Sequence, residues 1–263
     1  MEDRSTIRER ALTASGEELA ALLQHSSPEV LRALLDNRAL EEAQVCRVLE
    51  RKDLPGEFLE EVARRKALLK SYRVKRAIAF HPHAPRLVSM RLLRDLYLMD
   101  LVQMALLPGV SAELKRQAEE QLLARMPQIA LGQKVTLARR GPGRVAGALL
   151  AEGHPHVLAV VLDNPNLNEG HVLKVLAREK LPEAVVQAVA HHRKWSISYN
   201  VRIALVRNPA SPLGVVLSFL PHLTLSDLRE LAAPGLLAES LRKYLQAEVA
   251  RRMHAGAGEK AEE

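Results

Sequence analysis

Histidines are the first residues in this sequence that could do chemistry. Two His-Pro-His motifs begin at His81 and His154, and a His-His pair begins at His191. Zinc needs three or four convergent ligands, and a His-Pro-His loop supplies two at most. We therefore expect solvent-exposed loop histidines, and we predict no metal and no other cofactor.

Nucleophile and nucleotide motifs are equally sparse. Cys46 is the only cysteine, which excludes an internal disulfide, and its place on an apolar helical face favours a core position. The Gly-Pro-Gly turn at Gly141 follows no strand, so we expect a plain turn between helices rather than nucleotide binding. No serine-histidine-aspartate signature, nucleophile elbow or HExxH motif is present. The sequence therefore predicts a protein that is not an enzyme.

Trp195 is the only tryptophan, and two interpretations of it are open. A large apolar ring most often packs in a core, which is what we expect here. The alternative is a platform on which a base or another ligand stacks.

Positive charge is the strongest functional signal. Lysine and arginine number 38 against 31 acidic residues, for a net charge of +7. Segments 62–94, 121–151 and 184–226 contain no acidic residue. If they meet on one face they form a basic binding surface, and otherwise the charge serves solubility. The candidate residues are Arg65, Lys66, Lys70, Arg73, Arg76, Arg139, Arg140, Arg144, Arg193, Lys194, Arg202 and Arg207.

The elements that must position these residues are helical. Aromatic residues make up only 3% of the chain, which disfavours a β-sandwich or barrel. Apolar residues follow the helical i, i+3, i+4 spacing, as at Val45, Val48 and Leu49. Asn-Pro pairs at Asn164 and Asn208 fit helix ends where asparagine takes the left-handed conformation. The sequence therefore predicts an all-α fold of short helices.

An internal repeat organises these helices. Shifted by about 127 residues, the chain matches itself: the Leu-Asp-Asn run ending at Asn37 falls on the one ending at Asn164, and Tyr72 falls on Tyr199. A shorter period of about 44 residues lies within each copy. Residues kept in both copies are expected to serve the repeat, with turn roles for the asparagines and packing for the tyrosines.

The repeat also predicts the domain organisation. Residues 1–127 form the first copy and residues 128–254 the second, joined as one continuous solenoid with a tandem duplication. The small, polar residues 255–263 are expected to be a disordered tail.

One stretch carries a family resemblance. Residues 201–212 read VRIALVRNPASP and resemble the leucine-rich repeat variant motif, and Leu54-Pro55 with Leu59 and Val62 resembles its second half. More broadly, the chain resembles HEAT and armadillo repeats. This resemblance implies a right-handed α-solenoid of short stacked helices that offers a binding surface. The cysteine cluster that binds iron–sulfur in one member of the variant family is missing here, so redox chemistry is not implied.

Two functions are open at this stage. The favoured one is a non-enzymatic scaffold that binds a protein partner, and the basic segments indicate an acidic one. The alternative is nucleic-acid binding through phosphate contacts, by analogy with HEAT-like alkylpurine DNA glycosylases. For such a glycosylase Trp195, Asp100 and Asp227 would be the residues of interest. The scarcity of aromatic residues argues against base stacking or flipping.

The predicted location is cytoplasmic, without membrane contact. No apolar segment follows the first residues, so no secretory signal is predicted. The most apolar stretches are shorter than a bilayer span. The oligomeric state is left open.

Overall fold

Helices account for all the regular secondary structure in the computed structural model, which describes residues 4–233 and 239–259. No strand occurs among these residues, so the prediction of an all-α fold is confirmed. The chain divides into two compact units: unit 1 at Met1–Arg125 and unit 2 at Met126–Glu263. Of the described part of the chain, no helix combines the length and the apolar character needed to cross a membrane.

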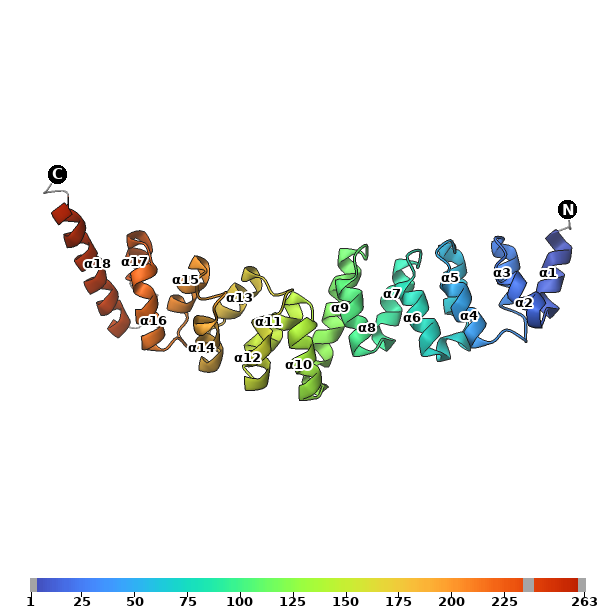
Figure 1. Ribbon diagram of the computed structural model, residues 1–263, viewed down its shortest axis with the longest axis horizontal. Coiled ribbons are helices and arrows are strands. Elements are labelled where there is room, and N and C mark those ends of the chain that lie inside the picture. The colour runs from blue at the N-terminus through green and yellow to red at the C-terminus, as the bar shows by residue number, and fades with distance from the viewer. Residues whose placement is uncertain (1–3, 234–238, 260–263) are drawn as a thin grey trace. The chain divides into compact units, whose positions relative to one another are not determined.

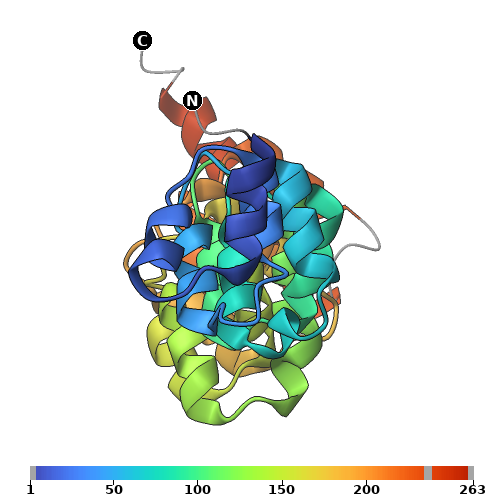
Figure 2. The same ribbon diagram turned by 90° about the vertical axis from the view of Figure 1, so that its right-hand side faces the viewer.

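Unit 1 consists of short helices that lie side by side (Figure 1), and Figure 2 views it from its α1 end. In chain order its elements are α1 (Arg4–Thr13), α2 (Gly16–Leu22), α3 (Pro28–Leu34), α4 (Glu42–Leu49), α5 (Gly56–Arg64), the 3₁₀ turn η1 (Leu68–Lys70), α6 (Tyr72–Phe80), α7 (Arg86–Leu92), the 3₁₀ turn η2 (Leu93–Asp95), α8 (Leu98–Leu106) and α9 (Ala112–Arg125).

Unit 2 is built in the same way. Its elements are the 3₁₀ turn η3 (Met126–Gln128), α10 (Leu131–Arg140), α11 (Gly143–Glu152), α12 (Pro155–Val161), α13 (Glu169–Leu176), α14 (Glu183–His191), α15 (Tyr199–Arg207), α16 (Leu213–Phe219), the 3₁₀ turn η4 (Leu220–His222), α17 (Leu225–Leu231) and α18 (Glu239–Glu259). Of the tail predicted to be disordered, residues 255–259 belong to α18, and residues 260–263 lie outside the described residues.

Helices two places apart in the order pack against each other. The pairs are α1 with α3 and α4 with α6 in unit 1, and α10 with α12 and α13 with α15 in unit 2. Buried asparagines join the C-terminal ends of three of these pairs. Asn37, just after α3, donates from Nδ2 to the carbonyl oxygens of Ala11 and Ala14, at 2.8 Å each, at the end of α1. Because the C-terminal ends meet, the paired helices run in the same direction.

Unit 2 repeats this tie twice. Asn164 Nδ2 donates to Ala138 O at 2.8 Å and Gly141 O at 3.1 Å. Asn208 Nδ2 donates to Leu176 O at 2.6 Å. This hydrogen bond joins the end of α15 to the end of α13 in the same way. These bonds satisfy carbonyl groups that a helix leaves without an internal partner.

The expectation of left-handed asparagines was wrong. No described residue other than glycine has a positive φ, and Asn208 has an extended backbone with φ −75° and ψ 125°. The helix still ends where the sequence predicts, because the residue before a proline is disfavoured in the α region. The asparagine side chain is used instead to bind the neighbouring helix.

In the pair α4 and α6, a histidine takes the place of the asparagine: His81, just after α6, binds the segment that follows α4. Its Nδ1 accepts a hydrogen bond from the backbone N–H of His83 at 3.1 Å. The proton must then sit on Nε2, which donates to Arg51 O at 2.6 Å. His81 is only 7% exposed, so the expectation that it is a solvated loop residue was wrong.

Two further sequence expectations are confirmed in the core. Trp195 is buried, and its indole N–H donates to Leu162 O at 2.9 Å. The segment at Gly141 is a turn between α10 and α11. Just after this turn, at the first residue of α11, Gly143 is buried so closely that a Cβ atom would stand 2.2 Å from Asn166 O and 2.3 Å from His171 Cε1. Only glycine fits this approach.

Candidate functional site

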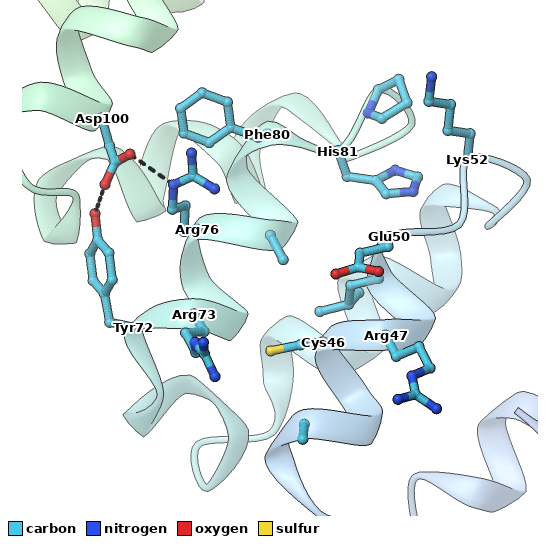
Figure 3. Close-up of a pocket in the computed structure, with 14 residues that line it drawn as sticks. Cys46, Arg47, Glu50, Lys52, Tyr72, Arg73, Arg76, Phe80, His81 and Asp100 are labelled. Carbon is cyan, nitrogen blue, oxygen red and sulfur yellow. Dashed lines mark hydrogen bonds and ion pairs between the residues drawn. The ribbon is translucent and has the colours of Figure 1, made fainter. Parts of the chain in front are cut away.

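Unit 1 contains an open groove of about 890 Å³ between α4 and α6 (Figure 3). We call it the cationic groove, because four cations line it and only two acids do. The cations are Arg47, Lys52, Arg73 and Arg76, and the acids are Glu50 and Asp100.

Helix α4 supplies one wall of the groove because of how its apolar residues are spaced. Val45, Val48 and Leu49 are buried against the core. The opposite face of the same helix therefore carries Cys46 and Arg47 towards the groove. A capping interaction fixes the start of α4, where Gln44 Oε1 accepts from the backbone N–H of Glu41 at 2.8 Å.

Helix α6 supplies the other wall. Its buried residues are Val74, Ile78 and Ala79. Arg73, Arg76 and Phe80 follow each other at helical spacing on the face that lines the groove. The hydroxyl of Ser71 accepts from Val74 N at 3.3 Å and fixes the first turn of this helix.

A hydrogen-bonded network holds one end of the groove. Arg76 Nε donates to Asp100 Oδ1 at 2.8 Å, while the hydroxyl of Tyr72 donates to Asp100 Oδ2 (Figure 3). The same hydroxyl accepts from Tyr97 N at 2.9 Å, and the rings of Tyr72 and Tyr97 stack with centroids 3.8 Å apart. Arg76 also lies 5.0 Å from the centre of the Phe80 ring. Its guanidinium is therefore held in place and partly neutralised.

Burial, followed by the hydrogen bond to Asp100, raises the pKa of Tyr72 from 10.0 to about 12. The folded state thus keeps this hydroxyl protonated at a pH where the unfolded chain loses the proton. Its contribution to stability is complete below pH 10 and is lost as the pH rises from 10 towards 12.

We expect Tyr72→Phe to lower the free energy of unfolding by about 1–2 kcal/mol, because the Asp100 carboxylate and the Tyr97 N–H both lose a partner. Urea denaturation measures the change, and the variant should lack the stability loss of the native chain between pH 10 and 12. Tyr244→Phe, at a residue that is 52% exposed, is the control and should change stability by less than about 0.5 kcal/mol. Equal effects of the two substitutions would contradict the network.

The other three cations of the groove have no such partner. Arg47, Lys52 and Arg73 are exposed, and among the described residues none of them pairs with a carboxylate. Their charges therefore face solvent in the groove and are free to meet an anionic group. The fold does not neutralise them.

Cys46 is half-buried on the groove wall, so its expected core position was wrong. Val45 takes the adjacent core position, and one residue along a helix rotates the side chain away from it by about 100°. Burial, followed by the nearby Glu42, raises the pKa of the Cys46 thiol, although Arg73 opposes that effect. A neutral thiol is a poor nucleophile and a poor metal ligand. Among the described residues no group of three or more His, Cys, Asp or Glu side chains could hold a metal ion.

The cations of the predicted basic surface lie on several elements of each unit. In unit 1, Arg73 and Arg76 line the groove, whereas Lys66 and Lys70 are exposed in the segment that joins α5 to α6. Arg65, in that same segment, donates to Leu35 O at 2.8 Å and to Asp36 Oδ1 at 2.6 Å, which ties α5 to the end of α3.

The predicted cations of unit 2 are also spread over several helices. Exposed side chains lie on α10 and α11 and in the turn after α14: Arg139, Arg140, Arg144, Arg193 and Lys194. Lys194 Nζ lies 4.2 Å from the centre of the Trp195 ring. Arg202 donates to Ser196 O at 2.7 Å, and Arg207 pairs with Glu230 at 2.7 Å.

Sequence reasoning missed Arg47 and Lys52. Both lie outside the acid-free segments, close to Glu50 in the chain. The signal that identifies Arg47 is its position on α4, opposite the buried residues Val48 and Leu49. A helical wheel of α4 drawn together with one of α6 would have placed Arg47 and Arg73 on the two walls of one groove.

Unit 2 has a second groove, of about 570 Å³, between α13 and α15. Leu173 and Ile203 line it, with Asn200 and Arg207 also present. Each of these residues lies 127 residues after its equivalent in the cationic groove. In the order given, the equivalents are Cys46, Arg76, Arg73 and Phe80.

Comparison of this chain with protein-family models, with curated proteins and with solved structures finds no match in any of the three. What the groove binds is therefore inferred from the residues that line it.

Proposed function

We propose that this chain is a helical-repeat scaffold that binds an acidic segment of a protein partner in the cationic groove. It acts by binding and not by catalysis. Its repeats are of the HEAT, armadillo or leucine-rich-variant type, arranged as a right-handed α-solenoid, and an ancestral unit was duplicated in tandem.

Recurring hydrogen bonds support the duplication. The Tyr72 hydroxyl donates to Asp100, and 127 residues later the Tyr199 hydroxyl donates to Asp227. The asparagine tie at Asn37 recurs at the same interval at Asn164. Helix bounds follow the same interval, since α3 is Pro28–Leu34 and α12 is Pro155–Val161. Such agreement in side-chain hydrogen bonds is expected from copies of one unit.

The observation that carries the binding proposal is a set of exposed cations on the two walls of one groove that have no carboxylate partner in the described part of the chain. Arg47 lies on α4, Arg73 lies on α6, and Lys52 follows α4. Neighbouring like charges repel one another, so an anionic occupant lowers the energy of the groove.

The unit 2 groove indicates that the repeat itself does not need most of these cations. At the positions equivalent to Lys52, Arg73 and Arg76 stand Glu179, Asn200 and Ile203, and α13 and α15 still pack together. The tyrosine and asparagine contacts recur while these groove residues differ. This pattern is typical of a common framework with a site-specific surface.

An extended acidic peptide fits this geometry better than a compact ligand. The groove is open to solvent, and its cations are distributed over α4, α6 and the segment after α4. A peptide that carries several carboxylates can meet all of them along its length. Because the charges are exposed, affinity should fall with added salt.

The test is fluorescence anisotropy with a labelled probe peptide of aspartate, glutamate and serine, set against the same peptide with asparagine and glutamine in place of the acids. We expect the acidic probe alone to bind, and Arg73→Glu to weaken it about five- to tenfold, because a pairing charge becomes a repelling one. Lys66→Glu is the matched control, since Lys66 is also exposed but does not line the groove. It should change affinity less than about twofold.

Two results would overturn the proposal. One is that the acidic probe does not bind at low salt, and the other is that Arg73→Glu and Lys66→Glu weaken it equally. A mobility-shift titration with single-stranded and double-stranded DNA and RNA completes the test. Nucleic-acid binding with a steep salt dependence that Arg139→Glu and Arg193→Glu reduce would place the function on the dispersed cations instead.

A further inference from the structure

A second concavity adjoins the cationic groove in unit 1. It measures about 400 Å³ and lies between the end of α6 and the loop that joins α8 to α9. We call it the apolar hollow. Phe80, His81 and Pro82 line both the hollow and the groove. These residues form a wall that the two concavities share.

Several apolar side chains line the hollow, together with the polar residues Ser89 and Ser111. Leu107 and Val110 are half-buried and Pro108 is exposed, while Leu114 lies buried beneath. At its edge the guanidinium of Arg86 pairs with the carboxylate of Glu113, so these two charges already neutralise each other. What remains for a ligand is partly exposed apolar surface.

We infer that the acidic partner segment carries an apolar side chain of about leucine size next to its carboxylates, and that this side chain enters the apolar hollow. This inference rests on the proposed function of the cationic groove. The two sites share Phe80 and Pro82 as a common wall, so one extended segment occupies both. The charges of the groove select the acidic run, and the hollow takes the anchor.

Energetics favour such a two-part ligand. Ion pairs between exposed groups contribute little each and are screened by salt. Burying one leucine side chain changes affinity by about ten- to a hundredfold, which is more than one exposed ion pair supplies. The groove confers the preference for acidic sequence, whereas the hollow confers much of the affinity.

Three labelled probe peptides test this inference on the full chain. The first has an acidic run with one leucine at either end, the second replaces the leucines with serine, and the third keeps the leucines but has asparagine and glutamine in place of the acids. We expect the first to bind about tenfold or more tighter than the second, because only it buries a leucine.

A substitution in the loop between α8 and α9 then tests whether the preference for leucine arises in the hollow. Val110→Asp puts a charge into the hollow and should remove the difference between the leucine and serine probes while the serine probe binds as before. Leu87→Asp is the matched control: Leu87 is 79% exposed on α7 and does not line the hollow. It should keep the difference intact.

The outcomes separate this inference from the proposal beneath it. If both acidic probes bind equally, the apolar anchor is refuted while the acidic groove stands. If neither acidic probe binds, the proposed function itself fails. If Val110→Asp and Leu87→Asp reduce the leucine preference equally, the anchor sits elsewhere and the hollow is excluded.

Discussion

Replacing Gly143 with alanine is expected to destabilise the protein by about 3 kcal/mol, at the upper end of what overpacking a core produces. The new Cβ would stand 2.2 Å from the backbone oxygen of Asn166 and 2.3 Å from Cε1 of His171. Moving either neighbour away would cost stability. The oxygen belongs to the backbone, and the His171 ring accepts from Asn168 N at 3.3 Å in the cap of α13. In a chain of this size such a loss lowers the melting temperature by roughly 6–12 °C.

A second glycine provides the control for this measurement. Gly132, on α10, has nothing within 4 Å of where its Cβ would stand. Gly132→Ala should therefore stabilise by about 0.5 kcal/mol, because alanine loses less backbone entropy in a helix. Thermal denaturation followed by circular dichroism distinguishes the two substitutions by sign. A Gly143→Ala variant as stable as the native chain would mean that α11 does not approach the start of α13 as described.

Asn164→Ala is expected to lower the free energy of unfolding by a similar amount, about 3 kcal/mol. Asn164 is 0% exposed, and its side chain makes three hydrogen bonds: to Ala138 O, to Gly141 O and, as acceptor, from Asn166 N at 2.7 Å. Alanine removes the bonds to Ala138 O and Asn166 N, while Gly141 O keeps Asn166 Nδ2 as a donor at 3.1 Å. A buried polar group left unsatisfied is far more costly than a missing surface bond.

The same substitution at an exposed asparagine isolates that effect. Asn200 is exposed, and its side chain donates to Glu169 at 2.8 Å. Asn200→Ala should shift stability by no more than about 0.5 kcal/mol. Urea denaturation gives both values, and hydrogen exchange should show faster exchange at the end of α10 in the Asn164 variant alone. Equal losses in the two variants would show that the buried tie contributes no special stability.

The sequence was sufficient to predict the helices and where many of them end. Apolar spacing predicted the buried faces, as at Val45, Val48 and Leu49, and Asn-Pro pairs predicted the ends of α12 and α15 to within a few residues. These features depend on neighbours along the chain. The partners of Asn37 lie 23 and 26 residues away, and no local pattern indicates which carbonyl groups they are.

The pairing of charges also depends on residues that are distant in the chain, and the sequence alone does not reveal it. Segment 62–94 contains no acidic residue, which left open whether its cations form a basic binding surface or only serve solubility. Its cations nevertheless find carboxylates from outside the segment, since Lys75 pairs with Asp95 and Arg76 with Asp100. Arg73 stays unpaired in the described part of the chain. Counting charges along a sequence therefore overestimates the positive surface, because the fold brings in acids from neighbouring helices.

The buried asparagine hydrogen bonds join residues that are close in sequence, and this has a consequence for folding during synthesis. The tie at Asn208 spans at most 32 residues and the one at Asn164 at most 26. A nascent polypeptide needs only about thirty residues beyond the first helix of a pair before the second can lock onto it. Each unit can thus assemble progressively during translation, without waiting for distant segments to emerge from the ribosome.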